Sequence, residues 1–258
     1  MEKITAKSNN KIKYAVKLST SSAARRENGE FFLEGARLCS DAAKSDTEIV
    51  RAFFTEEALS KYSDYIGVIT GVCSDCCLIS DDIAGRLSDT GSSQGVFCIC
   101  KMKENKGELN TKGKYIALEN IQDPSNFGAV CRTAEALGTD GLIIAGGCDL
   151  YNPKALRAAM GSSLRMKIIE TDNLPCFINQ ANNGGMQTLA CVPAKDALDI
   201  RKVDMSGGVI GCIGNEGNGL TDETINACSH RVTIPMEGRA ESLNASVAAS
   251  IVAWELKR

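Results

Sequence analysis

The sequence contains a single histidine, His230, and this scarcity removes two common kinds of site. A structural zinc site needs four cysteine or histidine ligands. Cys73 and Cys76 form one C-x-x-C, but no second C-x-x-C and no second histidine complete the set. The histidine stands beside Arg231, just before a short apolar run, so we expect a structural or exposed role. The sequence therefore predicts neither a metal site nor a histidine base.

Long apolar runs are also absent. No stretch approaches the roughly 18–20 residues that a membrane span needs. Lys11, Lys13 and Lys17 interrupt the N-terminal apolar residues, where a signal peptide would have its core. Many of the twelve cysteines fall inside predicted strands or helices, where a free cysteine behaves as a small apolar residue. We therefore expect a reduced, cytoplasmic protein without a membrane segment.

The chain lacks the net positive charge of a typical nucleic-acid binder, since its formal charge is −3. The average conceals a basic segment, because residues 1–26 hold Glu2 as their only acid. The cations of this segment include Lys7, Lys11, Lys13, Arg25 and Arg26. They form either a solvated helix face or, if the partner is RNA, an arm that contacts phosphates.

Short apolar runs alternate with helical patterns in the first hundred residues. The patterns predict strands at 30–33, 49–54, 66–69 and 95–100, and helices at 11–18, 35–43, 56–61 and 79–87. This alternation indicates an α/β sandwich. We find no acid–base or nucleophile constellation there, so we expect this half to serve recognition.

The second half repeats βα units. Largely apolar strands are predicted at 115–118, 141–145, 166–169, 188–192 and 209–213, as in a parallel sheet covered on both faces. Helices are expected at 125–137, 152–164 and 247–254. No G-x-G-x-x-G follows the first strand, so an ordinary dinucleotide site is not predicted. Because residues 101–114 have linker composition, we predict an N-terminal domain at 1–104, a linker at 105–113 and a second domain at 114–258.

Two loops of the second half make little sense as scaffold. Residues 214–219 (Gly-Asn-Glu-Gly-Asn-Gly) form a glycine-rich turn after a predicted strand, which suggests a pocket lined by backbone. Residues 234–246 form a polar loop before an uncharged helix. In the helix predicted at 125–137, Arg132 lies opposite the apolar stripe that contains Phe127 and Val130.

Taken in chain order, the helix at 125–137 and the two loops resemble the three motifs of the SpoU (TrmH-like) family of SPOUT-type RNA 2′-O-ribose methyltransferases. The matching stretches are Asp123–Ala134, Gly214–Gly219 and Ile234–Ser246. Ser8–Lys13 and Phe32–Leu38 resemble the family's RNA-recruiting domain less sharply. The resemblance implies an α/β-knot domain with a parallel sheet and a deep trefoil knot, a small N-terminal α/β substrate-binding domain, and a homodimer formed through the C-terminal domain.

The resemblance also implies an activity, the transfer of a methyl group from S-adenosyl-L-methionine to a ribose 2′-hydroxyl of RNA. The separate N-terminal domain favours ribosomal over transfer RNA; a non-catalytic RNA-binding homologue is the rival interpretation. The implied catalytic positions are Asn126, Arg132, Glu216, Ser242 and Asn244. The implied cofactor positions are Leu189, Gly214, Gly219, Ile234, Met236 and Leu243. Arg132 joins the N-terminal cations as an RNA-binding candidate.

Arg132 carries the main mechanistic hypothesis. The family proposal makes this arginine a base assisted by a substrate phosphate, but a guanidinium in a protein is effectively always protonated. We expect Arg132 instead to stay cationic, hold the phosphate and stabilise the developing alkoxide, while phosphate or water accepts the proton. Glu216 would orient the guanidinium. Asn126, Ser242 and Asn244 are open to a second interpretation as helix caps.

Overall fold

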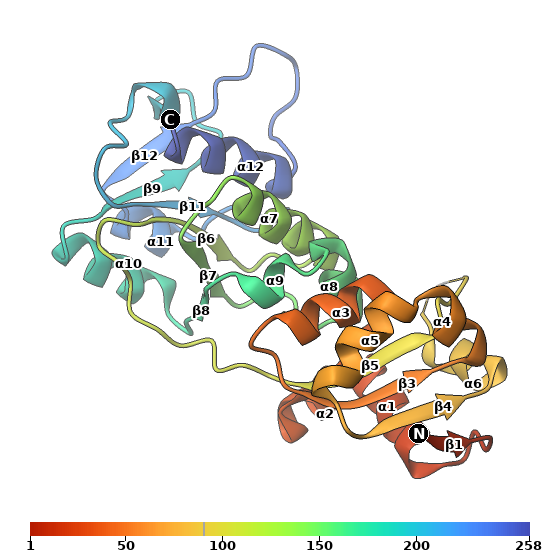
Figure 1. The fold of residues 1–258 in the computed structure, drawn as a ribbon. Helices are drawn as coiled ribbons and strands as arrows, with labels where there is room; N and C mark the ends of the chain where they lie inside the picture. Colours follow the sequence, from red (N-terminus) through yellow and green to blue (C-terminus); the bar gives the residue numbers. More distant parts are fainter. Residues whose placement is uncertain (90) are drawn as a thin grey trace. The chain divides into compact units, whose positions relative to one another are not determined.

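The computed structural model describes residues 1–89 and 91–258, and these residues divide into two compact units (Figure 1). The first unit contains residues 1–104 together with 149–165. The second contains residues 105–148 and 166–258. The domain limits predicted from composition would place 149–165 in the second domain, and these limits remain a proposal. No helix in the described ranges is both long enough and apolar enough to cross a membrane.

The first unit is built on a mixed sheet of five strands in the order β1-β4-β3-β5-β2. Strands β1 and β3 run parallel to β4, and β5 runs antiparallel to β2 and β3. The strands are β1 (Glu2–Ile4), β2 (Glu30–Glu34), β3 (Ile49–Phe54), β4 (Cys76–Ile79) and β5 (Val96–Lys101). The helices are α1 (Asn10–Thr20), α2 (Ser22–Asn28), α3 (Ala36–Lys44), α4 (Glu56–Lys61), α5 (Ser63–Val72), α6 (Asp81–Leu87), α8 (Pro153–Ala159) and α9 (Ser162–Arg165).

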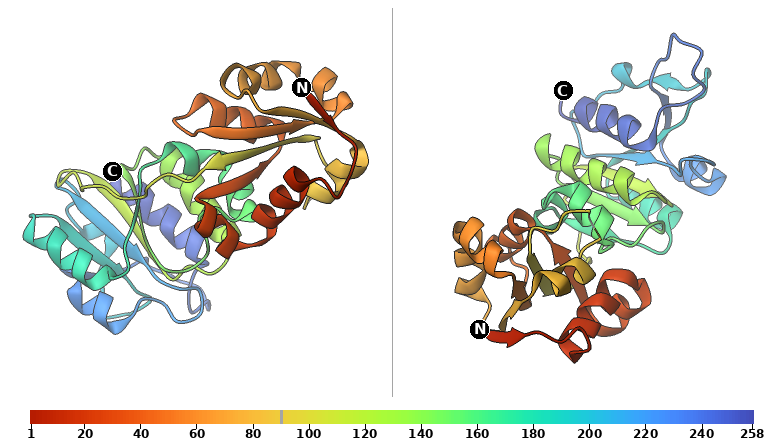
Figure 2. Two further views of the ribbon diagram at one scale, coloured as in Figure 1. Left: turned by 90° about the horizontal axis from the view of Figure 1, so that it is seen from below. Right: turned by 90° about the vertical axis from the view of Figure 1, so that its right-hand side faces the viewer.

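Helices cover both faces of this sheet (Figure 2). One face packs against α1 and α6 in a core that includes Ile12, Leu18, Phe53 and Phe97. Helices α3 and α5 pack against each other outside that core. The α/β sandwich predicted for this half is confirmed.

The strand predicted at 66–69 is wrong, because these residues lie within helix α5. Ile66 and Ile69 are both buried, and residues three apart lie on the same face of a helix. A four-residue apolar run does not distinguish a strand from a turn of buried helix. The strand of this region is β4, in the cysteine-rich stretch that follows, where Cys77 lies in the core.

The second unit contains a seven-stranded sheet in the order β10-β12-β9-β11-β6-β7-β8, and every pairing in it is parallel. The strands are β6 (Lys114–Glu119), β7 (Gly141–Ala145), β8 (Ile168–Glu170), β9 (Gln187–Cys191), β10 (Leu198–Asp199), β11 (Val209–Ile213) and β12 (His230–Thr233). The helices are α7 (Pro124–Ala136), α10 (Leu174–Asn183), the 3-10 helix η1 (Ile200–Lys202), α11 (Asp222–Ala227) and α12 (Ala245–Leu256).

Successive residues of β11 point to opposite faces of this sheet, so they show which helix covers each face. Ile210 and Cys212 join a core with α10, whereas Gly211 faces α12. A Cβ at Gly211 would lie 2.4 Å from Cγ1 of Val252, so the missing side chain lets α12 rest directly on β11. Helix α7 lies beside α12, where the Ser250 hydroxyl lies 3.4 Å from that of Thr133 (Figure 1).

The strand order places a ligand site. From β6 the chain moves outward to β7 and β8, then returns across the sheet to β9 before β11 inserts between β9 and β6. In open parallel sheets, ligands bind beyond the carboxyl ends of the strands where the winding direction reverses. The predicted motif loops follow β6, β11 and β12, so all three leave the sheet at this edge. The doubly wound sheet is confirmed, and the knot remains a prediction.

Candidate active site

The glycine loop, residues 214–219, turns back on itself directly after β11. Asn215 and Gly219 exchange backbone hydrogen bonds of 3.0 and 2.9 Å. A Cβ at Gly214 would lie 2.0 Å from the carbonyl carbon of Gly219, so no other residue fits without moving the backbone. The Asn215 side chain fills the turn, because its Oδ1 accepts from the amides of Gly217 and Asn218. The loop is therefore a preformed element.

Two side chains clamp the glycine loop to the connection between β6 and α7. Asn215 donates from Nδ2 to the carbonyl of Asn120 at 2.8 Å. Glu216 accepts from the amides of Gln122 and Asp123 at 3.1 and 3.3 Å. These amides precede α7, where a helix terminus leaves N–H groups without intrahelical partners. Glu216 thus accepts from the start of a neighbouring helix, 90 or more residues away in sequence.

Asn126 joins the three predicted motifs. It donates from Nδ2 to Glu216 Oε1 at 2.9 Å, and its Oδ1 accepts from Asn244 Nδ2 at 3.1 Å. Asn244 also caps α12, since its Oδ1 accepts from the amides of Ser246 and Val247. The structure therefore brings Asn126, Glu216 and Asn244 together in one series of hydrogen bonds, and the capping interpretation also holds for Asn244.

The pKa of Glu216 is lowered from its ordinary value. Partial burial acts to raise this pKa, but the hydrogen bonds from Asn126 and from nearby backbone amides together outweigh it. The carboxylate is therefore held ionised as an acceptor. It is poorly suited to carry a proton at neutral pH, and its geometry suits positioning.

Arg132 projects from α7 into solvent. It lies six residues beyond Asn126, about 9 Å along the helix axis. Across residues 1–89 and 91–258, no hydrogen bond or ion pair engages its guanidinium, and Glu216 accepts from Asn126 rather than from Arg132. The predicted orienting contact is therefore not formed in the single chain. Ser242 is likewise exposed, and no described residue bonds to its hydroxyl.

The predicted cofactor positions occupy the loops at the sheet edge, with one exception. Ile234 directly follows β12, and Ile234, Met236 and Leu243 are half-buried in the loop that leads to α12. Gly214 and Gly219 are the two ends of the glycine loop. Leu189 lies inside β9, fully buried between Gly211 and His230 of the neighbouring strands.

The edge fits a cofactor that is gripped by backbone. Parallel strands β12, β9 and β11 end side by side, and the glycine loop packs so closely at Gly214 that only backbone lines it there. Half-buried apolar side chains flank it at Ile234, Met236 and Leu243. A pocket with apolar walls and a few convergent polar groups is typical of small-molecule sites.

The basic N-terminal residues fall into two groups. Lys7 pairs with Asp82 at 2.6 Å, and Lys11 pairs with Glu2 at 2.8 Å and with Asp75 at 3.0 Å. The hydrogen bonds that Lys11 donates to Glu2 and Asp75 raise the pKa of Lys11. Lys13 and Arg26 are exposed, and Arg26 donates only to the Ser22 hydroxyl within the described ranges. These four cations remain RNA-binding candidates.

Arg25 does not suit an RNA-contacting arm. It is 2% exposed, and its guanidinium lies 2.5 Å from Asp149 and 2.6 Å from the carbonyl of Leu18. A buried arginine that pairs with a carboxylate and a carbonyl stabilises the fold instead. Composition cannot distinguish such a residue from its exposed neighbour Arg26.

Several residues of the site were missed from the sequence. Asn120 has a φ of +55°, uncommon outside glycine, and its carbonyl accepts from Asn215. Glu119 is buried and accepts from the hydroxyls of Thr221 and Thr224, which fixes the end of β6 to the start of α11. The only signal in the sequence is that Asn120 directly follows a strand. Glu119 gives none, because a carboxylate at a strand end is usually exposed.

Two family models match this chain. The model of the SpoU rRNA Methylase family matches residues 113–254, and that of the MRM3-like substrate binding domain matches residues 9–98. The chain is 30% identical, over its full length and that of the relative, to the 23S rRNA (guanosine(2553)-2′-O)-methyltransferase RlmP of Bacillus subtilis.

Solved structures agree with the family models. The AdoMet-bound rRNA methyltransferase of Sinorhizobium meliloti is 25% identical and has a TM-score of 0.88 over 99% of this chain and 97% of that one. An RNA 2′-O ribose methyltransferase is 26% identical, with a TM-score of 0.83 over 98% and 97% of the two chains. The sheet, the three converging motifs and the family model over more than half of the chain lead to one conclusion. The chain belongs to the SpoU rRNA methylase family.

Proposed function

We propose that this protein transfers a methyl group from S-adenosyl-L-methionine to a ribose 2′-hydroxyl of ribosomal RNA. Membership of the SpoU family supports the reaction. The Bacillus relative named for 23S rRNA supports the substrate class, and the Sinorhizobium relative that binds AdoMet supports the cofactor. The observation that carries the proposal is the hydrogen-bonded series Glu216–Asn126–Asn244, which closes three loops at the ligand edge of the sheet.

In this proposal Arg132 is the group that meets the RNA. Its exposed guanidinium on α7, to which no residue in the described ranges bonds, holds a phosphate next to the reacting ribose and stabilises negative charge that develops on the 2′-oxygen. The phosphate or a water accepts the hydroxyl proton, because the guanidinium keeps its own. Ser242 supplies a hydroxyl to the same region. Asn126 and Glu216 position the start of α7, and with it Arg132.

The cofactor would lie against Gly214, Gly219, Ile234, Met236 and Leu243, above the β9 strand that contains Leu189. When bound, S-adenosyl-L-methionine supplies a methyl group that is already activated by its positively charged sulfur. The residues of this chain therefore contribute alignment, which is worth about 7–11 kcal/mol in well-oriented reactions. The preformed glycine loop fits that role.

We propose further that two copies assemble through the second unit. Helix α12 carries mostly apolar residues, yet in the single chain Val247 is 47% exposed and Trp254 is 64% exposed. These residues lie seven apart on one face of the helix, as in a helix that packs against a partner. We also propose the trefoil knot, an RNA-recruiting role for residues 1–104, a linker at 105–113, and a cytoplasmic location in keeping with an rRNA substrate.

Incubation of unmodified ribosomal RNA and transfer RNA with methyl-labelled S-adenosyl-L-methionine tests the proposal. We expect label in a 2′-O-methylnucleoside from ribosomal RNA, and loss of that label with Arg132→Ala. Label in transfer RNA alone would assign the other substrate. Calorimetric titration with the methyl donor distinguishes the enzyme from a non-catalytic RNA-binding homologue, which would bind RNA but not the methyl donor.

A further inference from the structure

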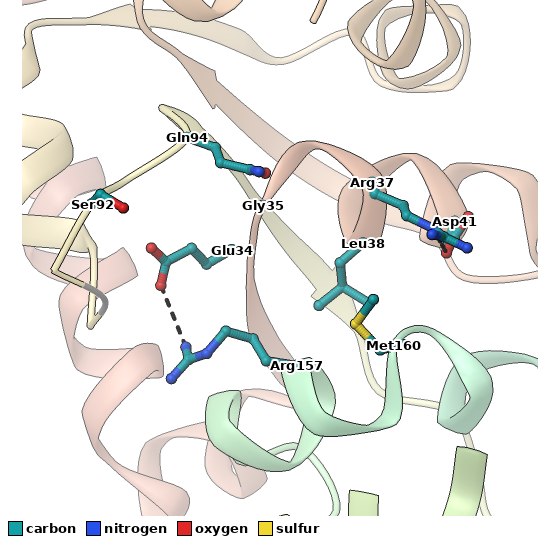
Figure 3. Close-up of a pocket in the computed structure, with 9 residues that line it drawn as sticks. All are labelled: Glu34, Gly35, Arg37, Leu38, Asp41, Ser92, Gln94, Arg157 and Met160. Atoms are coloured by element: carbon teal, nitrogen blue, oxygen red, sulfur yellow. Dashed lines mark hydrogen bonds and ion pairs between the residues drawn. The ribbon is translucent and has the colours of Figure 1, made fainter. Parts of the chain in front are cut away.

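A separate hollow of about 390 Å³ lies in the first unit, at the start of α3 (Figure 3). Its size is within the range of small-molecule sites. The lining residues come from β2, α3, α8 and the segment before β5, and none belongs to the candidate active site. They are Glu34, Gly35, Arg37, Leu38, Asp41, Ser92, Gln94, Arg157 and Met160. All but Arg157 and Met160 lie within the stretch that matches a substrate-binding domain.

One side of the hollow is apolar. Figure 3 shows the side chains of Leu38 and Met160 next to each other there. Leu38 is 8% exposed, whereas Met160 is 43% exposed although it is a large apolar residue. Met160 also has a φ of +51°, a left-handed conformation that disfavours every residue with a side chain. Glycine adopts this conformation without that strain, and strained backbone of this kind clusters at ligand sites.

The opposite side is polar and electrically balanced. Glu34 accepts from Arg157 at 3.4 Å, and Arg157 also donates to Asp89 at 2.9 Å, so the guanidinium is fixed (Figure 3). Gln94 accepts from the amide of Ala36 at 2.9 Å through Oε1, and its Nε2 amide donates to no described residue. The two lining cations are matched by two lining carboxylates, so the hollow favours a neutral group over a phosphate.

We propose that this hollow binds one unpaired nucleobase of the RNA substrate. The base would place its face on Leu38 and Met160 and its edge toward the Gln94 amide and the Arg157 guanidinium. Proteins read single-stranded RNA by stacking splayed bases on flat or apolar groups and by hydrogen bonding to their edges. The choice of RNA as the occupant rests on the proposed function.

Binding of short RNA to the full-length protein tests the pocket without any need for catalysis. Fluorescently labelled hexaribonucleotides of A, C and U are titrated by anisotropy, and an RNA hairpin with a long G–C-rich stem provides the duplex for comparison. The variant is Met160→Gly, which removes the apolar surface at a backbone conformation that glycine accepts freely. Met160→Leu restores an apolar side chain, and Val72→Ala changes an exposed apolar residue of α5 outside the hollow. Thermal melting checks that each variant is folded.

We expect single strands to bind more tightly than duplex, and Met160→Gly to weaken single-strand binding at least about fivefold. Met160→Leu should recover most of the affinity, and Val72→Ala should not change it. Hexamers that contain 4-thiouridine should crosslink to peptides that contain residues 34–41, 92–94 or 157–160. Unchanged affinity in folded Met160→Gly, no binding by the wild type, or crosslinks only elsewhere would each overturn the proposal. If the wild type binds RNA here but binds no methyl donor, the pocket stands and the proposed reaction fails.

Discussion

Replacement of Asn126 by aspartate would convert the central link of the site into a repulsion. The amide nitrogen that donates to Glu216 at 2.9 Å becomes a carboxylate oxygen. Two unit charges about 4 Å apart repel by about 1 kcal/mol in water and about 4 kcal/mol near a protein surface. Because Glu216 is exposed, we take a repulsion energy near the lower of these two figures. The lost hydrogen bond adds about 1 kcal/mol to it. In our proposal the methyl donor binds only when the three loops are held together, so a loss of about 2 kcal/mol in this link would lower the affinity for the donor by up to about thirtyfold.

The pH dependence gives this prediction a signature. In the variant, the paired carboxyls titrate together and one folded-state pKa rises, so the penalty is absent at low pH and grows as the pH rises. Wild-type Glu216 behaves in the opposite way, since its pKa is lowered: its stabilisation is present above the ordinary pKa of a glutamate and is lost as the pH falls through the lowered pKa of the folded state.

Calorimetric titration of S-adenosyl-L-methionine at pH 5 and pH 8 measures this effect. The affinity gap between wild type and Asn126→Asp should narrow at pH 5. Asn183→Asp adds the same charge at the exposed C-terminal end of α10, outside the site, where no described residue bonds to the Asn183 side chain, and should bind nearly as the wild type does. Equal affinity of Asn126→Asp and wild type at both pH values would refute the role assigned to Asn126.

Three further predictions concern other parts of the molecule. Arg132→Lys should lower the methylation rate about tenfold or more, because the compact ammonium of lysine replaces a planar guanidinium that binds phosphate with two donors. The rate of the variant should not recover as the pH rises to about 9; recovery would indicate that residue 132 acts as a base. Arg25→Met should lower the free energy of unfolding by about 3 kcal/mol, because it removes the buried cation that pairs with Asp149 and leaves that carboxylate with the Tyr151 amide. Urea denaturation measures this, and a loss below about 1 kcal/mol would contradict a stabilising role for the Arg25–Asp149 pair. Gly214→Ala should abolish binding of the methyl donor in a chain that still folds, because the added Cβ would overlap the Gly219 backbone. Calorimetry measures this binding, and near-normal affinity would contradict a closely packed loop.

The sequence predicts those parts of the site whose residues lie close together in the chain at a fixed spacing. The parallel sheet followed from apolar runs without alternation, and the glycine loop from four glycines around Asn215 and Glu216. The meeting of Asn126, Glu216 and Asn244 was implied only by their motif positions. Which atom bonds to which depends on residues 90 and 118 positions apart in the sequence, and no periodicity encodes that.

The wrong predictions arose where the segment is too short to show its period or where the deciding contact is distant in sequence. Ile66 and Ile69 were assigned to a strand because four residues do not reveal whether the period is 2 or 3.6. Arg25 was assigned to an RNA arm because its partner, Asp149, is 124 residues away. The hollow beside Met160 was not foreseen, because it combines segments that are distant in sequence, and a positive φ at methionine has no sequence signal.

The central claim is that this chain methylates a ribose of ribosomal RNA from the edge where its three motif loops meet. Digestion of labelled ribosomal RNA to nucleosides, after reaction with wild type and with Arg132→Ala, measures it most directly. We expect label in one 2′-O-methylnucleoside with the wild type and almost none with the variant. Label on a base, or equal label from both proteins, would contradict it.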